Sequence, residues 1–149
     1  MKIAVGSDHG GFHLKQVVMK HLDELGLEYK DFGCESCASV DYPDYALAVA
    51  EAIVSGEFDR GIIICGTGIG ISISANKVPG IRAALCSDTY SAKMSRQHND
   101  ANVLAFGERV IGPGLALDIV DMFLKEKFLG GRHAVRVNKI KMIEQKYSK

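Results

Sequence analysis

The sequence lacks an excess of charge of either sign, since 18 lysines and arginines balance 18 aspartates and glutamates. A balanced chain has no overall field that draws it to nucleic acid or to an anionic membrane, so any anion site must be local. The chain also lacks an apolar stretch near the roughly 18 residues that span a bilayer, and its first residues lack the apolar centre of a secretory signal. We therefore expect a cytoplasmic protein that binds neither nucleic acid nor membrane.

Cysteine is also scarce, with four in the chain: Cys34, Cys37, Cys65 and Cys86. We expect free thiols, because no secretory signal points to an oxidising compartment and two of the four lie in or beside apolar runs. Cys34 and Cys37 form a CESC motif, which has the spacing of half a zinc site or of a redox pair. No second pair or nearby histidine completes a zinc set, so the sequence predicts no metal site and no cofactor.

What is present is an alternation of short apolar runs with longer segments of helical period, which is typical of an α/β fold. A chain of 149 residues fits one domain, 1–149. We predict a Rossmann-like three-layer domain with a mostly parallel five-stranded sheet and a C-terminal helical extension. The predicted strands are 2–6, 28–32, 61–65, 81–86 and 102–106. The predicted helices are 14–25, 43–56, one from about 68, one from about 88, 113–128 and 134–146.

Polar residues follow three of the predicted strands. They are residues 7–11 after the first strand, 65–70 after the third, and Ser87 with Asp88 after the fourth. In an open α/β sheet, ligands bind beyond the carboxyl ends of the strands, so these groups are expected to share one site. Asp41 and Tyr42, in the motif DYPDYA, either flank that site or simply begin a helix.

The segment ICGTGIGIS, residues 64–72, is the most informative stretch. A strand that ends in glycines and opens a helix directs backbone N–H groups at one spot, where a phosphate or an oxyanion is stabilised. The glycine spacing is neither that of a dinucleotide-binding loop nor that of a P-loop, and a tight turn is the plain alternative. Cys65 is either a small apolar residue or a thiolate that acts as base or nucleophile. As a base it would remove a proton next to a carbonyl, and acyl transfer would use the same parts.

Two later motifs add polar candidates. In SRQHND, residues 95–100, His98 is a candidate acid or base and Asn99 a donor and acceptor, although a helix C-cap explains both. In GGRHAVR, Arg132 and Arg136 are four residues apart, so on a helix they share a face that can hold a phosphate. A solvated helix face is the alternative for these arginines. Arg109, which follows the last predicted strand, is a third candidate.

The motifs SDHGGF, DYPDYA, ICGTGIGISISANK, SRQHNDANVLAFGERV and GGRHAVR occur in this order over nearly the whole chain. Together they resemble ribose-5-phosphate isomerase type B, of the wider group that includes galactose-6-phosphate isomerase subunits. The resemblance implies a metal-independent isomerase that interconverts ribose 5-phosphate and ribulose 5-phosphate through an enediolate. The alternatives are an isomerase of a six-carbon sugar phosphate such as allose 6-phosphate, and a non-catalytic sugar-phosphate sensor.

The resemblance also implies roles for particular residues. Cys65 is the base that moves a proton between C2 and C1, Thr67 assists it, and His98 opens the furanose ring. The enediolate is held by backbone N–H groups of Gly66, Thr67, Gly68, Ile69 and Gly70. Substrate-binding positions are Asp8, His9 and Asn99, and those that serve the phosphate are Arg109, Arg132 and Arg136. The resemblance further implies a homodimer or a dimer of dimers whose active site is shared, with His98 and Asn99 reaching across.

Overall fold

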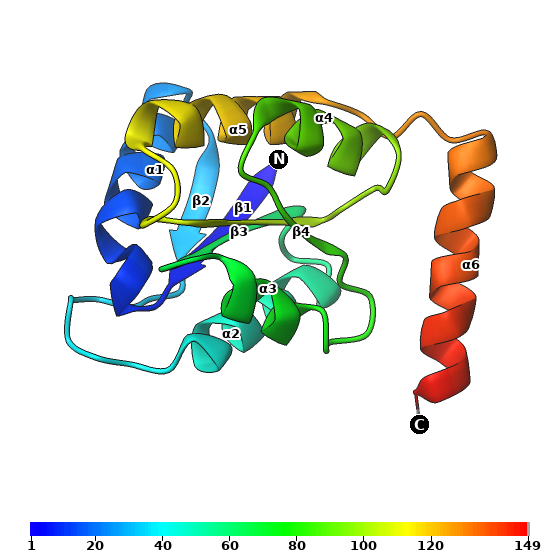
Figure 1. The fold of residues 1–149 in the computed structure, drawn as a ribbon, viewed down its shortest axis with the longest axis horizontal. Helices are drawn as coiled ribbons and strands as arrows, with labels where there is room; N and C mark the ends of the chain where they lie inside the picture. The colour runs from blue at the N-terminus through cyan, green and yellow to red at the C-terminus, as the bar shows by residue number, and fades with distance from the viewer. Residues whose placement is uncertain (149) are drawn as a thin grey trace.

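One sheet of five strands forms the middle layer of the protein (Figure 1). The structure is a computed structural model, and it describes residues 1–148; residue 149 of the predicted domain lies outside the described residues. The strands are β1 (Lys2–Ser7), β2 (Glu28–Asp31), β3 (Arg60–Cys65), β4 (Ala83–Leu85) and β5 (Val103–Gly107). Their order is β2-β1-β3-β5-β4, and all pairs are parallel. The predicted three-layer α/β fold is confirmed, with a sheet that is wholly parallel.

Helices cover both faces of the sheet. They are α1 (Phe12–Glu24), α2 (Tyr42–Val54), α3 (Ile69–Ala75), α4 (Thr89–Gln97), α5 (Pro113–Lys125) and α6 (Arg132–Tyr147), with a short 3₁₀ helix at His9–Gly11. In Figure 1, α1, α4 and α5 lie on one face and α2 and α3 on the other. Every crossover between parallel strands needs such a helix, which explains the alternation in the sequence.

The central strands are buried on both faces, and their side chains divide between two cores. Along β3, Ile62 and Ile64 pack with α1 and α5, whereas Ile63 and Cys65 pack with α2 and α3. This alternation follows from the two-residue period of a strand. Because both faces are covered, the sequence of the strand reads as one apolar run and not as alternating apolar and polar residues.

Several element boundaries differ from the predictions by one to three residues. The fourth strand covers only Ala83–Leu85, which are the residues in register with Val103–Ala105 of β5. Helix α5 ends at Lys125, since Glu126 has an extended backbone with ψ 146°. Helix α6 begins at Arg132, directly after Gly130 and Gly131, which both have positive φ. The two glycines thus separate α6 from the rest of the chain.

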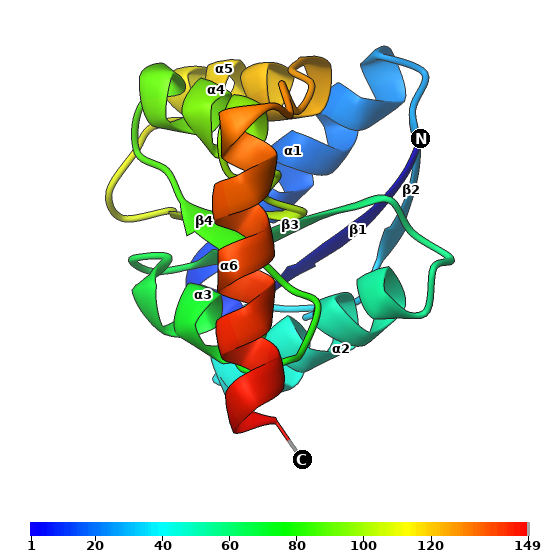
Figure 2. The same ribbon diagram turned by 90° about the vertical axis from the view of Figure 1, so that its right-hand side faces the viewer.

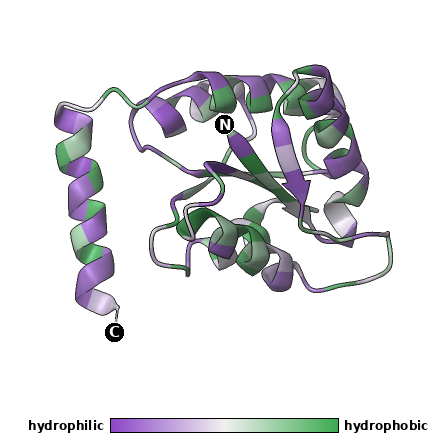
Figure 3. Ribbon diagram, turned by 180° about the vertical axis from the view of Figure 1, so that it is seen from behind, coloured by the Kyte–Doolittle hydropathy of each residue, from purple (hydrophilic) through white to green (hydrophobic). Residues whose placement is uncertain are grey.

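Helix α6 stands beside the three layers and is not part of them, as Figures 1 and 2 show from two directions. Its hydropathy alternates around the helix (Figure 3), and several large apolar side chains stay exposed: Val135, Ile140, Met142 and Ile143. A cavity of about 820 Å³ lies between α6 and the start of β4, lined by Ile81, Ala84, Ile140 and Ile143 among others. The predicted C-terminal helical extension is therefore present, with an apolar surface that the rest of the described chain does not cover.

Candidate active site

Cys65 is the last residue of β3, so it lies at the carboxyl edge of the sheet, the edge at which the parallel strands end. Its side chain is buried, with 5% of the residue exposed. The backbone N–H of Gly68 donates a hydrogen bond to Sγ of Cys65 over 3.0 Å. Gly68 adopts φ +81°, which turns the chain back toward the sulfur before α3 begins. The site therefore pairs a thiol with a backbone donor that stabilises negative charge on sulfur.

The glycine loop, residues 66–70, is held against the end of β5. The N–H groups of Glu108 and Arg109 donate to the carbonyls of Cys65 and Gly66, each over 3.0 Å. A Cβ added to Gly66 would lie 3.0 Å from Nη1 of Arg109, so the Arg109 guanidinium lies over this loop. The structure thus places a cationic side chain next to the N–H groups that the sequence predicted as an anion cradle.

Asp8 and His9 come directly after β1, at the same edge. The carboxylate of Asp8 is buried and accepts a hydrogen bond from the N–H of Gly10 over 2.9 Å, which caps the short 3₁₀ helix. A Cβ added to Gly10 would lie 3.1 Å from the nitrogen of Gly66, so this turn packs against the glycine loop. Nδ1 of His9 accepts from the N–H of Val40 over 3.1 Å. A neutral His9 therefore carries its proton on Nε2 and offers that N–H as a donor.

Tyr42 adds an aromatic side chain to this group. It is the first residue of α2, and a Cβ added to Gly70 would lie 2.6 Å from Cε1 of its ring. Tyr42 thus both begins a helix and flanks the glycine loop, which combines the two readings of the DYPDYA motif. Asp41 is the N-cap residue and makes no side-chain capping hydrogen bond. The N–H of Val40 was missed by sequence reasoning, because a backbone donor leaves no signal in the side chains.

The remaining candidates form a second group. His98 follows α4, and its ring stacks on that of His133 in α6 with 4.0 Å between centroids and 10° between planes. Arg132 and Arg136 are exposed at the start of α6, and Asn99 is exposed beside His98. Burial lowers the pKa of His133, and the positive charges of His98, Arg132 and Arg136 lower it further. His98, Arg132 and Arg136 thus lie near His133, and Asn99 is the chain neighbour of His98.

The two groups lie at opposite edges of the sheet. Helix α4 leaves the carboxyl end of β4 and returns to the start of β5, and β4 and β5 are parallel. Its last residues therefore lie at the amino edge, where the strands begin. Arg82, which directly precedes β4, donates through Nε to the carbonyl of Asn99 over 3.1 Å, in agreement with this placement. The structure brings together Asp8, His9, Cys65, the glycine loop and Arg109, but it does not bring His98 to them.

Two other predicted features have simpler roles. Asp88 caps α4, since its carboxylate accepts from the N–H and the hydroxyl of Ser91 over 2.6 and 2.8 Å; these bonds lower its pKa. All four cysteines are free thiols, as predicted. Cys37 lies 3.3 Å from Nε2 of His13, whereas Cys34 is buried and donates to the carbonyl of Ser36. Among residues 1–148, no three histidine, cysteine or acidic side chains are placed to hold a metal ion together.

A family model described as "Ribose/Galactose Isomerase" matches residues 3–140. The chain belongs to this isomerase family. The match runs from β1 into α6, so it includes both groups of candidate residues. The family resemblance drawn from the sequence motifs is therefore confirmed, and the protein is an enzyme of the isomerase class.

Family members with high identity cover essentially the whole chain. The ribose-5-phosphate isomerase B of Escherichia coli is 57% identical over 145 residues, which is 97% of this chain and 97% of the relative. A putative sugar phosphate isomerase of Bacillus subtilis is 60% identical and covers 98% of this chain and 99% of its own. The solved structure of Clostridium thermocellum ribose-5-phosphate isomerase B is 65% identical, with a TM-score of 0.98, over 99% of this chain and 100% of that one.

In the described part of the chain, no helix has both the length and the apolar character needed to cross a membrane. The longest helix, α6, has 16 residues and alternates apolar with charged side chains.

Proposed function

We propose that the protein is a ribose-5-phosphate isomerase that interconverts ribose 5-phosphate and ribulose 5-phosphate through an enediolate. The observation that carries the proposal is the buried Cys65 thiol with the Gly68 N–H directed at its sulfur. A sugar-phosphate sensor has no use for this pair, because binding a phosphate requires cations and N–H donors but no buried thiol. The named activity of the close relatives supports the same substrate.

In the proposed reaction, the Cys65 thiolate removes the proton from C2 of the open-chain aldose. The electron pair of that bond forms the C1–C2 double bond, and negative charge moves to O1, where backbone N–H groups of residues 66–70 stabilise it. The proton then returns to C1, while the O2 hydroxyl proton moves to O1, which yields the ketose. In this proposal Thr67 assists: its Oγ1 accepts from the N–H of Ile69 over 3.1 Å, so its own proton is free to be donated to the substrate.

Substrate binding at the carboxyl edge falls to three side chains in this proposal. Asp8 accepts from a sugar hydroxyl, and His9 donates through Nε2 because its Nδ1 is already occupied by Val40. Arg109, next to Gly66, neutralises negative charge on the substrate. The reaction as written needs no metal ion. We expect full activity in EDTA, and a loss of turnover that zinc or manganese restores would contradict this part of the proposal.

His98 opens the furanose ring in this proposal, and Asn99, Arg132 and Arg136 hold the rest of the substrate, including its phosphate. Since these residues lie at the amino edge of their own chain, they must come from a second copy. We therefore propose a homodimer, alone or within a dimer of dimers, with active sites shared between two subunits. The uncovered apolar side chains of α6 supply a surface for the association.

The base is tested with Cys65→Ala. We expect kcat to fall by orders of magnitude in a protein that still folds, because alanine removes only the sulfur atom and its contact with the Gly68 N–H. Cys37→Ala is the matched control, since that thiol is exposed. The assay follows ribulose 5-phosphate formation from ribose 5-phosphate in EDTA, with allose 6-phosphate in parallel. A Cys65→Ala protein as active as the control would remove the proposed base, and a faster hexose reaction would change the proposed substrate.

The shared site is tested by complementation. Cys65→Ala and His98→Ala proteins are each expected to be inactive or nearly so. Unfolding and refolding them together in equal amounts gives mixed dimers, each with one site that has both residues, and about one quarter of wild-type activity should return. Activity that stays at the sum of the two separate proteins would show that Cys65 and His98 do not meet across subunits.

A further inference from the structure

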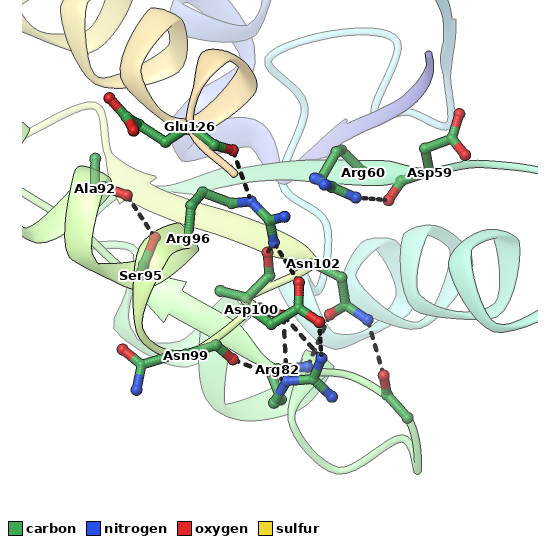
Figure 4. A network of polar contacts seen from close by, with 12 residues as sticks. Asp59, Arg60, Arg82, Ala92, Ser95, Arg96, Asn99, Asp100, Asn102 and Glu126 are labelled. Atoms are coloured by element: carbon green, nitrogen blue, oxygen red, sulfur yellow. Dashed lines mark hydrogen bonds and ion pairs between the residues drawn. The ribbon is translucent and has the colours of Figure 1, made fainter. Parts of the chain in front are cut away.

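The turn between α4 and β5 is fixed by two arginines that share one carboxylate (Figure 4). Oδ1 of Asp100 accepts from Nη1 of Arg96 over 3.0 Å, and Oδ2 lies 3.3 Å from Nη2 of Arg82. Arg96 is buried, with 3% of the residue exposed. A carboxylate between two guanidinium groups is a strong, directional arrangement, because each contact is a charge-assisted hydrogen bond.

The same two arginines also hold the backbone of the turn. Arg82 donates through Nη2 to the carbonyl of Asp100 over 2.8 Å and through Nε to that of Asn99 over 3.1 Å. Arg96 donates through Nη1 to the carbonyl of Ala101 over 2.5 Å. Three successive carbonyls are therefore occupied by the side chains that Asp100 holds in place.

Asp100 itself has an unusual backbone conformation. Its φ of 48° makes it the one residue other than glycine with positive φ among residues 1–148. A side chain in this region costs free energy unless the surroundings compensate, and Asp and Asn are among the residues that tolerate it best. The sequence analysis considered a helix C-cap at His98 and Asn99, and the positive φ falls one residue later, at Asp100. The carboxylate held by Arg82 and Arg96 explains why Asp100 takes it instead.

This turn carries His98 and Asn99. On the helix side, the N–H of His98 donates to the carbonyl of Met94 over 2.8 Å, and the carbonyl of Gln97 accepts from the N–H of Leu129 over 3.1 Å. On the other side, the N–H groups of Asp100 and Ala101 donate to the carbonyls of Arg96 and Ser95 over 3.3 and 2.9 Å, and the two arginines hold the carbonyls of residues 99–101. The Asp100 carboxylate is the group that ties both arginines to this turn, so it is one of the anchors that set the direction in which His98 and Asn99 leave α4.

We propose that Asp100 is a positioning residue for the isomerase reaction: by binding Arg82 and Arg96 it fixes the turn that presents the His98 ring to the substrate. This inference rests on the proposed function, in which His98 opens the sugar ring. Asp100 takes no part in the chemistry itself, since its carboxylate is already used by two guanidinium groups. The expected effect of its loss is a misplaced His98 ring, with the Cys65 group unaffected.

Two substitutions separate the carboxylate from the backbone conformation. In Asp100→Asn, the new side chain tolerates positive φ and keeps one acceptor oxygen. It carries no negative charge, so Arg82 and Arg96 lose their shared counter-charge. Asp100→Gly accepts positive φ freely and removes the side chain altogether. We expect kcat/KM for ribose 5-phosphate to fall by several-fold in Asp100→Asn and by about tenfold or more in Asp100→Gly, since small errors in the placement of a reacting group lower rates steeply.

A double-mutant cycle tests whether Asp100 acts through His98. Each Asp100 substitution is made in the wild-type chain and in His98→Ala, and kcat/KM is measured in all variants. If Asp100 positions His98, its substitution lowers kcat/KM in the wild-type chain but has no further effect in His98→Ala. A merely structural role would give the same fold-loss in both backgrounds, and this result, or no loss in either, would overturn the inference.

The controls keep the inference distinct from the proposed function. Asp121→Asn removes another carboxylate that contacts a side chain, Nε2 of His21 over 2.6 Å, and it should leave kcat/KM unchanged. A His98→Ala protein with the full wild-type rate would refute the role of His98 and hence the proposed function, whatever Asp100 does. If Asp100→Asn does not fold, Asp100→Gly carries the cycle, because glycine removes the cost of positive φ as well as the contacts.

Discussion

Gly107, the last residue of β5, is the position where one added methyl group should affect the active site most directly. A Cβ on Gly107 would lie 2.6 Å from both the carbonyl oxygen of Gly66 and the Cα of Thr67. The carbonyl carbon of Thr67 would be closer still, so the loop must shift by at least about 0.4 Å to reach 3.0 Å, below which real Cβ contacts essentially never occur. All three neighbours are backbone atoms and cannot rotate away. In Gly107→Ala the glycine loop must therefore move away from β5.

The shifted loop carries the N–H group that binds the Cys65 sulfur and the others proposed to hold the enediolate. An error of 1 Å in the placement of reacting groups can cost about a hundredfold in rate, so a shift of about 0.4 Å should lower kcat/KM by roughly tenfold. Overpacking at a buried position also destabilises a fold, typically by about 1–3 kcal/mol. We expect Gly107→Ala to fold at 25 °C and to lose activity.

The measurement is kcat/KM for ribose 5-phosphate, together with urea unfolding of the same protein. Gly114→Ala is the matched control: it adds the same methyl group in α5, and an added Cβ there meets no atom within 4 Å. Because alanine favours a helix over glycine, the control should gain up to about 1 kcal/mol of stability at unchanged activity. A Gly107→Ala protein with the activity of this control would refute the argument that the position of the loop limits catalysis.

Three further predictions concern stability and the state of His9. Since the pKa of His133 is lowered in the folded protein, the unfolded chain binds its proton at a higher pH, and the free energy of unfolding should fall as the pH drops below about 6.5. His133→Asn should flatten this dependence in urea titrations at pH 5 and 7, and an unchanged slope would contradict it. Val40→Pro removes the N–H that His9 accepts, so it should raise KM and shift the ¹⁵N resonances of the His9 ring away from the Nε2–H tautomer, whereas Val40→Ala should do neither. Lys15 is fully buried and binds Asp31 over 2.7 Å and the carbonyl of Cys34 over 2.5 Å, so Lys15→Met should cost about 2 kcal/mol. If Lys15→Met had the same urea midpoint of unfolding as the wild-type protein, that estimate would be refuted.

The fold followed from the sequence because each buried strand is a short apolar run and each helix has a regular apolar stripe. The start of α3 after Gly68 and of α5 at Pro113 were predicted correctly, since glycine and proline mark such boundaries by backbone geometry alone. The ends of β4 and α5 were less accurate, because pairing with β5 and the backbone of Glu126 decide them, and neither is local.

Within the candidate site, the parallel topology explains where the residues at the ends of strands lie. Cys65 ends β3 and Asp8 follows β1, so the parallel topology alone brings them to one edge. His98 ends a helix, so the same topology takes it to the other edge, which becomes evident only once the strand order is known. The burial of Lys15 was also missed, because a single lysine in an amphipathic helix is normally exposed. Nothing in the sequence indicates that Asp31 of β2 binds its ammonium group.

The two outer strands of the sheet have a consequence for how copies of the chain can join. An edge strand presents unpaired N–H and C=O groups, which invite a second sheet to add on and continue it. Here β2 has only four residues, with the sequence EYKD, and β4 has only three. Edges this short, and charged in the case of β2, offer little to a neighbouring strand. We therefore expect no sheet that continues from one molecule to the next, and we expect helices to make the contacts between molecules.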